Sequence, residues 1–582
     1  MFIPILLAAF AISAPPMIVT PDIADGDVIT QKKSIKVLVQ SDAIVTQVEF
    51  YVDDDLRDTA TATPYTFTVD PLMEKDGDEK LTFTAYNTDG AKATKSVTVK
   101  VDSGASKGAE ANTKIAKDFM TDSKWDDAIY AARIALKANS SYVPAQLVLS
   151  HVFLAKKVYD KAQEFAEDAL RSNPNLPEGL ELMATIQLER AFNSYSSGGS
   201  RTAFMNSMSD AIESAIAARK KVLDIEFDKL PAQGTGDFVQ YGRTAIAARH
   251  YSAAISALQP EFNSKFTTIL GNLIGYAQLR LGRFDDLQHT LELMKTYKTA
   301  DGYSYALWAV LSEYKGDEKG ADDNMREAIL DKVGDLGVQT AQAYIALRRG
   351  NIGILQGLAA HLQQDASNRP EVSYYLEILL HRLGRYFDSD REFQDTVLNE
   401  PLSFMMYVER GNEAVEKIIS KRETGDAFAY DTAVARRMYG AALAAKPDSV
   451  EALTAAATLD LMLSKFSQAR NEIDAAMAAN KGFSAAFYCA ASIYISLSYN
   501  LHSEADTIKA QATLGVDPET QILIDQRNKA ADDMRKLAYD LFATAQKLDT
   551  PRLGGGQMPR TADVFPYLYR YGMLPVITPP SG

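Results

Sequence analysis

Arginine and tyrosine residues recur at a constant interval in the middle of this 582-residue sequence. Steps of 34 residues separate Arg280, Tyr314, Arg348 and Arg382. Tyr276 and Tyr344 stand four residues before two of these arginines, and residues four apart share one face of a helix. A guanidinium pairs with a carboxylate, and a tyrosine ring stacks and hydrogen-bonds. This set therefore predicts a surface that binds an acidic or carboxyl-terminal segment of another protein or peptide.

The same arginines also have a purely structural interpretation. An arginine near the C-terminal end of a helix can satisfy the last carbonyl groups and interacts favourably with the helix dipole. The sequence leaves both interpretations open, because each needs a basic residue at the same place.

Residues suited to catalysis or metal binding are few. The only cysteine, Cys489, lies in the apolar stretch FYCAAS, where we expect it to behave as a small buried hydrophobe. The six histidines are scattered, and neither a phosphate-binding loop nor an H-E-x-x-H motif is present. Asp53, Asp54 and Asp55 offer oxygen ligands for calcium, but a solvated turn is the preferred interpretation. We therefore expect no enzymatic activity, no cofactor and no metal site.

The composition excludes some classes of protein. The sequence contains 61 Lys and Arg residues against 76 Asp and Glu residues, so its formal net charge is −15. Such an acidic chain is a poor candidate for sequence-independent nucleic-acid binding, which depends on neutralising phosphates. A hydrophobic content of 46% excludes a disordered chain, and the length predicts two to four domains.

The first 14 residues, MFIPILLAAFAISA, are uncharged and apolar and end in small residues. The run is too short to span a bilayer comfortably and has the character of the apolar part of a secretory signal peptide. We expect export to the periplasm, the cell surface or the extracellular space, with a buried N-terminal strand as the alternative. No other apolar stretch is long enough to cross a membrane, so the sequence predicts no transmembrane segment.

Alternation of apolar and polar residues with period two predicts an all-β domain over residues 17–102. Strands are expected at 34–39, 45–52, 56–61, 65–69, 81–86 and 94–101, which is the content of a β-sandwich. The stretches VEFYVDDDLRDTATATPYTFTVD and DGDEKLTFTAYNTDG resemble a bacterial Ig-like domain. That family usually has Gly where Asp54 stands, so the comparison implies a wider hairpin turn here.

Residues 103–108, SGASKG, form a predicted linker, and helical patterns extend from there over residues 109–550. A 34-residue period recurs in them, for example between KWDDAIYAARIAL and VYDKAQEFAEDAL. The period and the residues resemble tetratricopeptide repeats (TPRs), whose unit is a pair of antiparallel helices. The small residue of the family's first helix is matched by Ala116, Ser150, Gly275, Ala309, Ala343, Ala457 and Ala491. The alanine of its second helix is matched by Ala135, Ala169, Ala328, Ala442 and Ala476. Glu377 replaces the small residue in one unit, a departure that affects the packing there.

The resemblance implies a right-handed solenoid of ten or eleven helix pairs, each stacked only on its neighbours. Insertions interrupt the repeats near 192–207, 227–236 and 501–520, and the first two are expected as loops. Residues 551–582 form a tail rich in Gly, Pro and aromatic residues, which is interpreted as either a docking tail or an end cap.

The resemblance also implies where a partner binds, because in this family certain positions of each first helix line a concave groove. The candidate groove residues are Tyr276, Arg280, Tyr303, Tyr314, Tyr344, Arg348, Tyr374 and Arg382. The favoured hypothesis is an exported interaction protein that binds a peptide or protein segment there, with the Ig-like domain as a spacer or adhesion unit. One alternative is a cell-envelope assembly factor of the same fold. The other is a carbohydrate-binding or glycan-processing accessory protein, which exposed aromatic rings on the Ig-like domain would favour.

Overall fold

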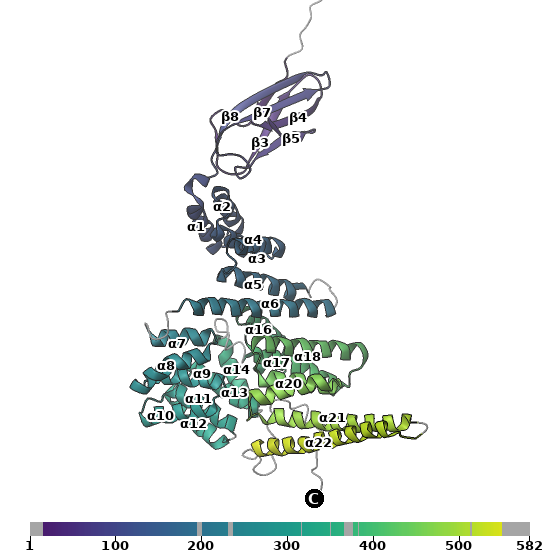
Figure 1. Ribbon diagram of the computed structural model, residues 1–582. Coiled ribbons are helices and arrows are strands. Elements are labelled where there is room, and N and C mark those ends of the chain that lie inside the picture. The colour runs from purple at the N-terminus through teal and green to yellow at the C-terminus, as the bar shows by residue number, and fades with distance from the viewer. Residues whose placement is uncertain are drawn as a thin grey trace, which may run out of the picture. The chain divides into compact units, whose positions relative to one another are not determined.

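The computed structural model describes residues 16–194, 201–230, 237–315, 317–349, 351–365, 376–381, 383–512 and 515–549. The expected multidomain fold is confirmed, with an all-β domain followed by an all-α repeat region (Figure 1). The chain divides into two compact units, Met1–Ile186 and Gln187–Gly582, and each is described here by itself. The predicted signal peptide at 1–14 and the tail at 551–582 lie outside the described residues.

Eight strands in two sheets build the N-terminal domain. They are β1 (Ile18–Pro21), β2 (Val28–Ile29), β3 (Lys33–Gln40), β4 (Val45–Val52), β5 (Asp55–Ala60), β6 (Tyr65–Val69), β7 (Gly77–Asn87) and β8 (Lys92–Val101). One sheet has the order β1-β3-β6, and the other has the order β2-β8-β7-β4-β5. The six predicted strands correspond to β3–β8, and the short strands β1 and β2 each add an edge to one sheet.

The two sheets enclose a core of aromatic and aliphatic side chains. Phe50 on β4, Phe67 on β6 and Phe83 on β7 are at most 1% exposed. Their ring centroids lie 5.1–5.9 Å apart. Because β6 belongs to the other sheet, these aromatic contacts join the two sheets across the core.

Asp53 and Asp54 form a two-residue turn between β4 and β5. Val52 pairs with Asp55 across this hairpin, and the two turn residues have φ values of 46° and 69°. Aspartate tolerates the left-handed region better than most residues with a side chain, so it can replace glycine in such a turn. The wider turn expected from the missing glycine is therefore wrong.

A short 3-10 helix, Ala105–Lys107, follows the β domain. After it, the described residues form 21 α-helices. The first unit contains α1 (Ala109–Thr121), α2 (Trp125–Ala138), α3 (Val143–Ala155), α4 (Tyr159–Ser172) and the beginning of α5 (Pro177–Ser194). The second unit continues with α6 (Arg201–Asp228), α7 (Phe238–Ala247), α8 (Tyr251–Lys265), α9 (Thr268–Arg280), α10 (Phe284–Thr296), α11 (Gly302–Lys315), α12 (Glu318–Asp331), α13 (Leu336–Arg349) and α14 (Ile352–Asp365). It ends with α16 (Tyr386–Asn399), α17 (Phe404–Lys421), α18 (Gly425–Ala445), α19 (Val450–Met462), α20 (Phe466–Ala479), α21 (Ser484–Gln511) and α22 (Pro518–Asp549).

The small residues that mark the repeats lie where paired helices approach each other. All of the following are 0% exposed: Ala116, Ser150, Ala309, Ala343, Ala457, Ala491, Ala135, Ala169, Ala328, Ala442 and Ala476. Ser150 Oγ donates a hydrogen bond of 2.7 Å to the carbonyl oxygen of Ala162 on the paired helix. A Cβ on Gly275 would lie 3.2 Å from both Leu287 and Leu307, so a larger side chain would push the helices apart. The predicted TPR-type helix pairs are confirmed.

The second unit departs from a solenoid in which each pair contacts only its neighbours. Helix α6 packs against α18, although α6 ends at Asp228 and α18 begins only at Gly425 (Figure 1). Lys220 Nζ on α6 donates to the carbonyl oxygen of Ala444 in the last turn of α18 at 2.5 Å. The segments expected as loops near 192–207 and 227–236 are also partly helical, because α6 occupies Arg201–Asp228.

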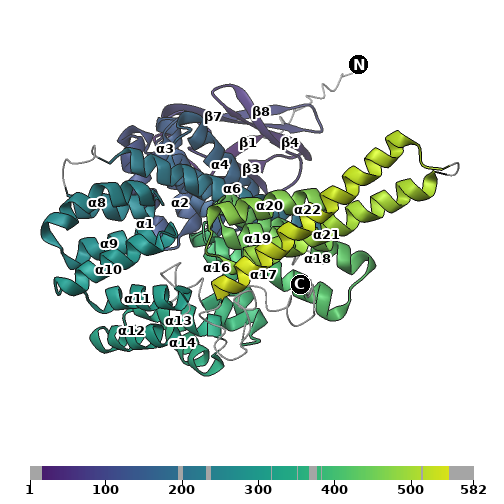
Figure 2. The same cartoon turned by 60° about the horizontal axis from the view of Figure 1, so that its bottom comes forward.

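Helices α21 and α22 form an antiparallel hairpin much longer than the other pairs (Figure 2). Residues at intervals of seven are buried between them: Ser484, Ala491, Ser498 and Ala505 on α21, and Ile524, Ala531, Ala538 and Ala545 on α22. A seven-residue repeat keeps two helices in contact along their length, and small side chains let them approach closely. Residues 501–511, which belong to the third predicted insertion, are therefore part of α21. They follow the seven-residue period of this hairpin and not the 34-residue period of the repeats.

Candidate functional site

The first helices of four successive pairs form one layer of the second unit. Helix α7 contacts α9, α9 contacts α11, and α11 contacts α13, while each also packs on the second helix of a pair. In a curved stack of helix pairs, the layer whose members contact one another directly lies on the inner side of the curve. We call α7, α9, α11 and α13 the first-helix layer.

Charge is divided unequally between this layer and the second helices. The first-helix layer carries one acidic residue, Glu313, and five basic ones: Arg243, Arg280, Lys315, Arg348 and Arg349. The second helices α8, α10, α12 and α14 carry ten acidic and four basic residues. Lys315 pairs with Asp285 of α10 at 3.5 Å and Arg349 pairs with Asp322 of α12, so the second helices balance part of this positive charge. The first-helix layer is still net basic in a chain with a net charge of −15, which favours anionic groups near it.

Arg280 lies over two tyrosine rings at the end of α9. Its guanidinium carbon is 5.8 Å from the ring centroid of Tyr251 and 5.9 Å from that of Tyr276. The two rings meet edge to face, with centroids 6.4 Å apart, and all three side chains are half-buried. The spacing of four residues did predict that Tyr276 and Arg280 share a face. Tyr251 was missed, because it is the first residue of α8 and no interval in the sequence connects it with Arg280.

Tyr314, the next member of the ladder, contacts the C-terminal half of its own unit. Its ring lies on Phe284, with centroids 4.2 Å apart, and its hydroxyl oxygen accepts a hydrogen bond of 2.9 Å from Nδ2 of Asn480. Tyr303 lies against the backbone at Gly337, where an added Cβ would be 2.6 Å from its ring. Tyr303 and Tyr344 are both half-buried.

The remaining candidates cannot be placed with their side chains. The side chain of Arg348, and all of Tyr374 and Arg382, lie outside the described residues. The neighbouring Arg349 is held by the chain itself. Its Nη2 lies 2.6 Å from Oε2 of the fully buried Glu313, and its Nη1 lies 2.7 Å from Oδ1 of Asp322. Arg349 therefore has a structural role, but through carboxylates of other helices and not through the last carbonyl groups of its own helix.

Glu377 replaces a small repeat residue and forms a buried charge cluster. Its carboxylate is 2% exposed, with Oε1 2.9 Å from Nε of Arg410 on α17 and 3.4 Å from Oγ of Ser389. Arg410 also reaches Asp390 at 2.6 Å and lies over the ring of Phe393. Burial outweighs the attraction of Arg410 and raises the pKa of Glu377 to about 8. The larger side chain is accommodated because an arginine from the next pair packs over it.

The described residues offer little for catalysis or metal binding. No group of three or more His, Cys, Asp and Glu side chains in the described ranges is arranged to hold a metal ion. Cys489 is buried, and burial raises the pKa of its thiol to about 12, which leaves it unreactive at neutral pH. Within the same ranges, no helix combines the length and the apolar character needed to cross a membrane.

Residues 18–101 match the family model described as "Bacterial Ig domain". The fibronectin(III)-like modules of Clostridium thermocellum CbhA are 28% identical, covering 15% of this chain and 97% of theirs, with a TM-score of 0.14. Yeast Tom70 is 13% identical, covering 74% of this chain and 96% of its own, with a TM-score of 0.29. The TPR domain of P58(IPK) is 14% identical, covering 74% of this chain and 98% of its own, with a TM-score of 0.20.

No curated protein matches the chain. The N-terminal domain is a bacterial Ig domain, and the helical region is of the TPR type in its helix pairs. These likenesses concern the fold alone.

Proposed function

We propose that this chain is an exported, non-catalytic scaffold that binds an acidic segment of another protein on its first-helix layer. The observation that carries the proposal is the separation of charge between the first and second helices of α7–α14. Ion pairs between the layers, Lys315 with Asp285 and Arg349 with Asp322, account for part of this division, but Arg243 and Arg280 take part in neither of these pairs. Such a division does attract a partner with carboxylates and orient it on approach.

The side chains around Arg280 supply the short-range part of recognition. Tyrosine and arginine dominate the energetics of protein interfaces, because they combine apolar surface with groups that form hydrogen bonds. The guanidinium of Arg280 contacts the rings of both Tyr251 and Tyr276, which reduces the side-chain entropy lost when it meets a carboxylate. Arg243 on α7 is exposed and extends the basic layer by one helix.

A role for the Ig-like domain as a spacer is supported by its surface. Its exposed large hydrophobic residues are the aliphatic side chains Ile18, Val28, Leu38, Ile44, Leu56 and Met73. Tyr51 and Tyr86 on its outer face are half-buried and already engaged, Tyr51 by the carboxylate of Glu49 and Tyr86 by the ammonium group of Lys92. Glycan-binding surfaces need exposed aromatic rings, and the strands of this domain do not provide a row of them.

The test uses a fluorescein-labelled peptide of alternating Glu and Tyr with a free carboxyl terminus, and the same peptide with Lys in place of Glu. Fluorescence anisotropy is measured with the wild-type chain, the double variant Arg243→Gln/Arg280→Gln, and Arg326→Gln as the matched control. Arg326 lies on α12, in a second helix, and forms an exposed ion pair with Asp323.

We expect the acidic peptide to bind and the lysine peptide not to bind. The double variant should lose roughly tenfold or more in affinity, about 1.4 kcal/mol, while Arg326→Gln stays within about twofold. Affinity should also fall as salt rises from low to physiological concentration. Equal losses for both variants, or equal binding of both peptides, would exclude the first-helix layer as the site.

A further inference from the structure

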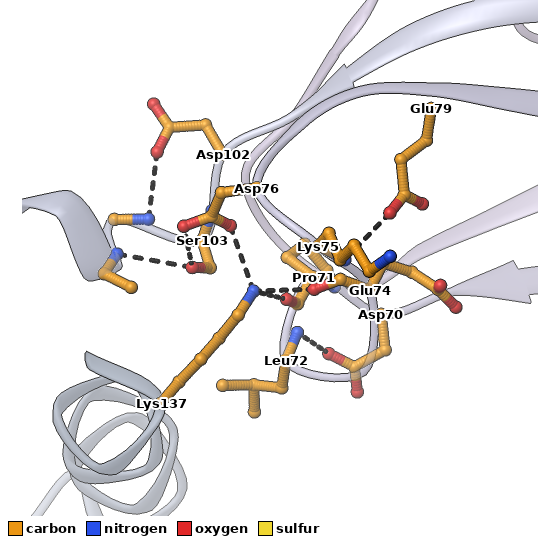
Figure 3. A network of polar contacts seen from close by, with 12 residues as sticks. Asp70, Pro71, Leu72, Glu74, Lys75, Asp76, Glu79, Asp102, Ser103 and Lys137 are labelled. Carbon is orange, nitrogen blue, oxygen red and sulfur yellow. Dashed lines mark hydrogen bonds and ion pairs between the residues drawn. The ribbon is translucent and has the colours of Figure 1, made fainter. Parts of the chain in front are cut away.

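Lys137 connects the helices of the first unit to the Ig-like domain. It lies in the last turn of α2, and its ammonium group enters the loop between β6 and β7 (Figure 3). There Nζ lies 2.6 Å from the carbonyl oxygen of Pro71, 2.8 Å from that of Glu74, and 3.0 Å from Oδ1 of Asp76. An ammonium group has three hydrogen-bond donors, so these three acceptors satisfy it completely. We call the three oxygens the ammonium socket.

The socket is also joined to the segment between the two domains. Asp76 accepts hydrogen bonds from the backbone nitrogen of Ser103 at 3.0 Å and from its Oγ at 2.8 Å. At the other end of the segment, Nδ2 of Asn112 on α1 donates to the carbonyl oxygens of Gly104 and Gly108. Residues 103–108, which a sequence rich in small residues marks as a linker, are therefore tied to both domains, and Figure 3 shows the bonds between Ser103 and Asp76.

The contacts in the socket are stronger than those of an ordinary surface ion pair. The side chains of Lys137 and Asp76 are only 21% and 31% exposed, so water screens them less than it screens an exposed pair. Although burial opposes the shift, the hydrogen bonds from Ser103 and Lys137 hold the pKa of Asp76 below its ordinary value. Asp76 thus stays ionised at neutral pH and keeps its attraction for the ammonium group. Without the ammonium group, the carbonyl oxygens of Pro71 and Glu74 would lose the hydrogen bonds that they accept from α2.

We propose that the ammonium socket fixes the Ig-like domain in one orientation on the first helix pairs, so that residues 17–186 move as one body. A polar six-residue linker without this lock would let the two domains rotate independently. The lock gives the Ig-like domain a defined direction relative to α1–α4, so whatever its surface contacts is held at a fixed place with respect to the start of the repeats. This inference is independent of the proposed binding on the first-helix layer.

The test measures the distribution of distances between two spin labels by pulsed electron resonance in the full-length chain. The labels are attached through Thr98→Cys on β8 and Glu164→Cys on α4, both exposed, while the native Cys489 is buried. Lys137→Met removes the ammonium group and keeps the length of the side chain. Lys156→Met is the matched control, because Lys156 in the same unit pairs at 2.6 Å with the exposed Asp126.

We expect one narrow distance distribution for the wild-type chain and for Lys156→Met, and at least a doubling of its width for Lys137→Met. Asp76→Asn, which leaves both carbonyl oxygens in place, should give an intermediate width and serves as the test should Lys137→Met fail to fold. A thermal melt by circular dichroism decides whether each variant is folded. The proposal is overturned by a broad distribution in the wild-type chain, or by folded socket variants whose distributions are as narrow as that of the wild type.

Discussion

Nδ2 of Asn480 lies 2.9 Å from the hydroxyl oxygen of Tyr314, although 166 residues separate them in the sequence. Tyr314 lies in the first-helix layer, and Asn480 directly follows α20 in the C-terminal part of the unit. Other polar contacts span similar distances along the chain, such as Arg249 with Glu400 at 3.0 Å and Lys220 with Ala444. The first-helix layer therefore contacts the chain's own later repeats at Tyr314.

Tyr314→Phe tests the long-range contact. The variant keeps the ring on Phe284 and removes the hydroxyl group that accepts from Asn480. We expect the free energy of unfolding to fall by about 1 kcal/mol, the usual contribution of one hydrogen bond, as measured by urea denaturation. Tyr297→Phe is the control, because Tyr297 is 52% exposed and stacks on Phe266. An equal effect of both variants would mean that the contact with Asn480 contributes nothing.

The raised pKa of Glu377 predicts that the free energy of unfolding depends on pH. Its pKa is about 8 in the folded chain and near 4.5 when unfolded, so between these values the folded state binds more protons. The free energy of unfolding should therefore fall as pH rises from about 5 to 8, by roughly 3 kcal/mol from this residue. Glu377→Gln should be less dependent on pH over the same range, and urea denaturation at several pH values measures the difference. Identical slopes for the variant and the wild type would contradict the assignment.

Replacing Gly411 on α17 with alanine tests how closely α17 and α18 pack. A Cβ at this position would lie 2.3 Å from Tyr439, a fully buried ring whose hydroxyl group bonds to Asn412. Gly411→Ala should destabilise the chain by about 1–3 kcal/mol through overpacking. Gly440→Ala is a matched control on α18, where an added Cβ meets nothing within 4 Å. That change should stabilise the chain by up to about 1 kcal/mol, because alanine favours helix over glycine. Thermal melts compare the two, and a stabilising Gly411→Ala would refute the close contact.

The proposed export is tested at the N-terminus of the native protein. If residues 1–14 act as a signal peptide, the mature chain should begin near Ile12 or Pro15. N-terminal sequencing of the protein from its own cells measures this directly. A chain that starts at Met1 would favour the alternative, in which the apolar run is a buried strand.

The local structure of this protein follows from the spacing of its residues. Alternation with period two identified β3–β8, and a 34-residue period placed Ala116, Ala309 and Ala457 at completely buried helix contacts. The spacing of Tyr276 and Arg280 also placed them on one face, where they do meet. These features were predictable because a helix or strand fixes the direction of each side chain from its position alone.

The long-range contacts were decided only by the tertiary structure. Helix α6 meets α18, Tyr314 meets Asn480, and Lys137 enters the loop that ends at Asp76, yet no interval in the sequence pairs these residues. Small rotations between successive helix pairs add up along a solenoid, so which distant repeats meet depends on the geometry of every pair between them. A lysine or tyrosine can hydrogen-bond to many groups, so its partner is decided only by which elements the tertiary structure brings within reach.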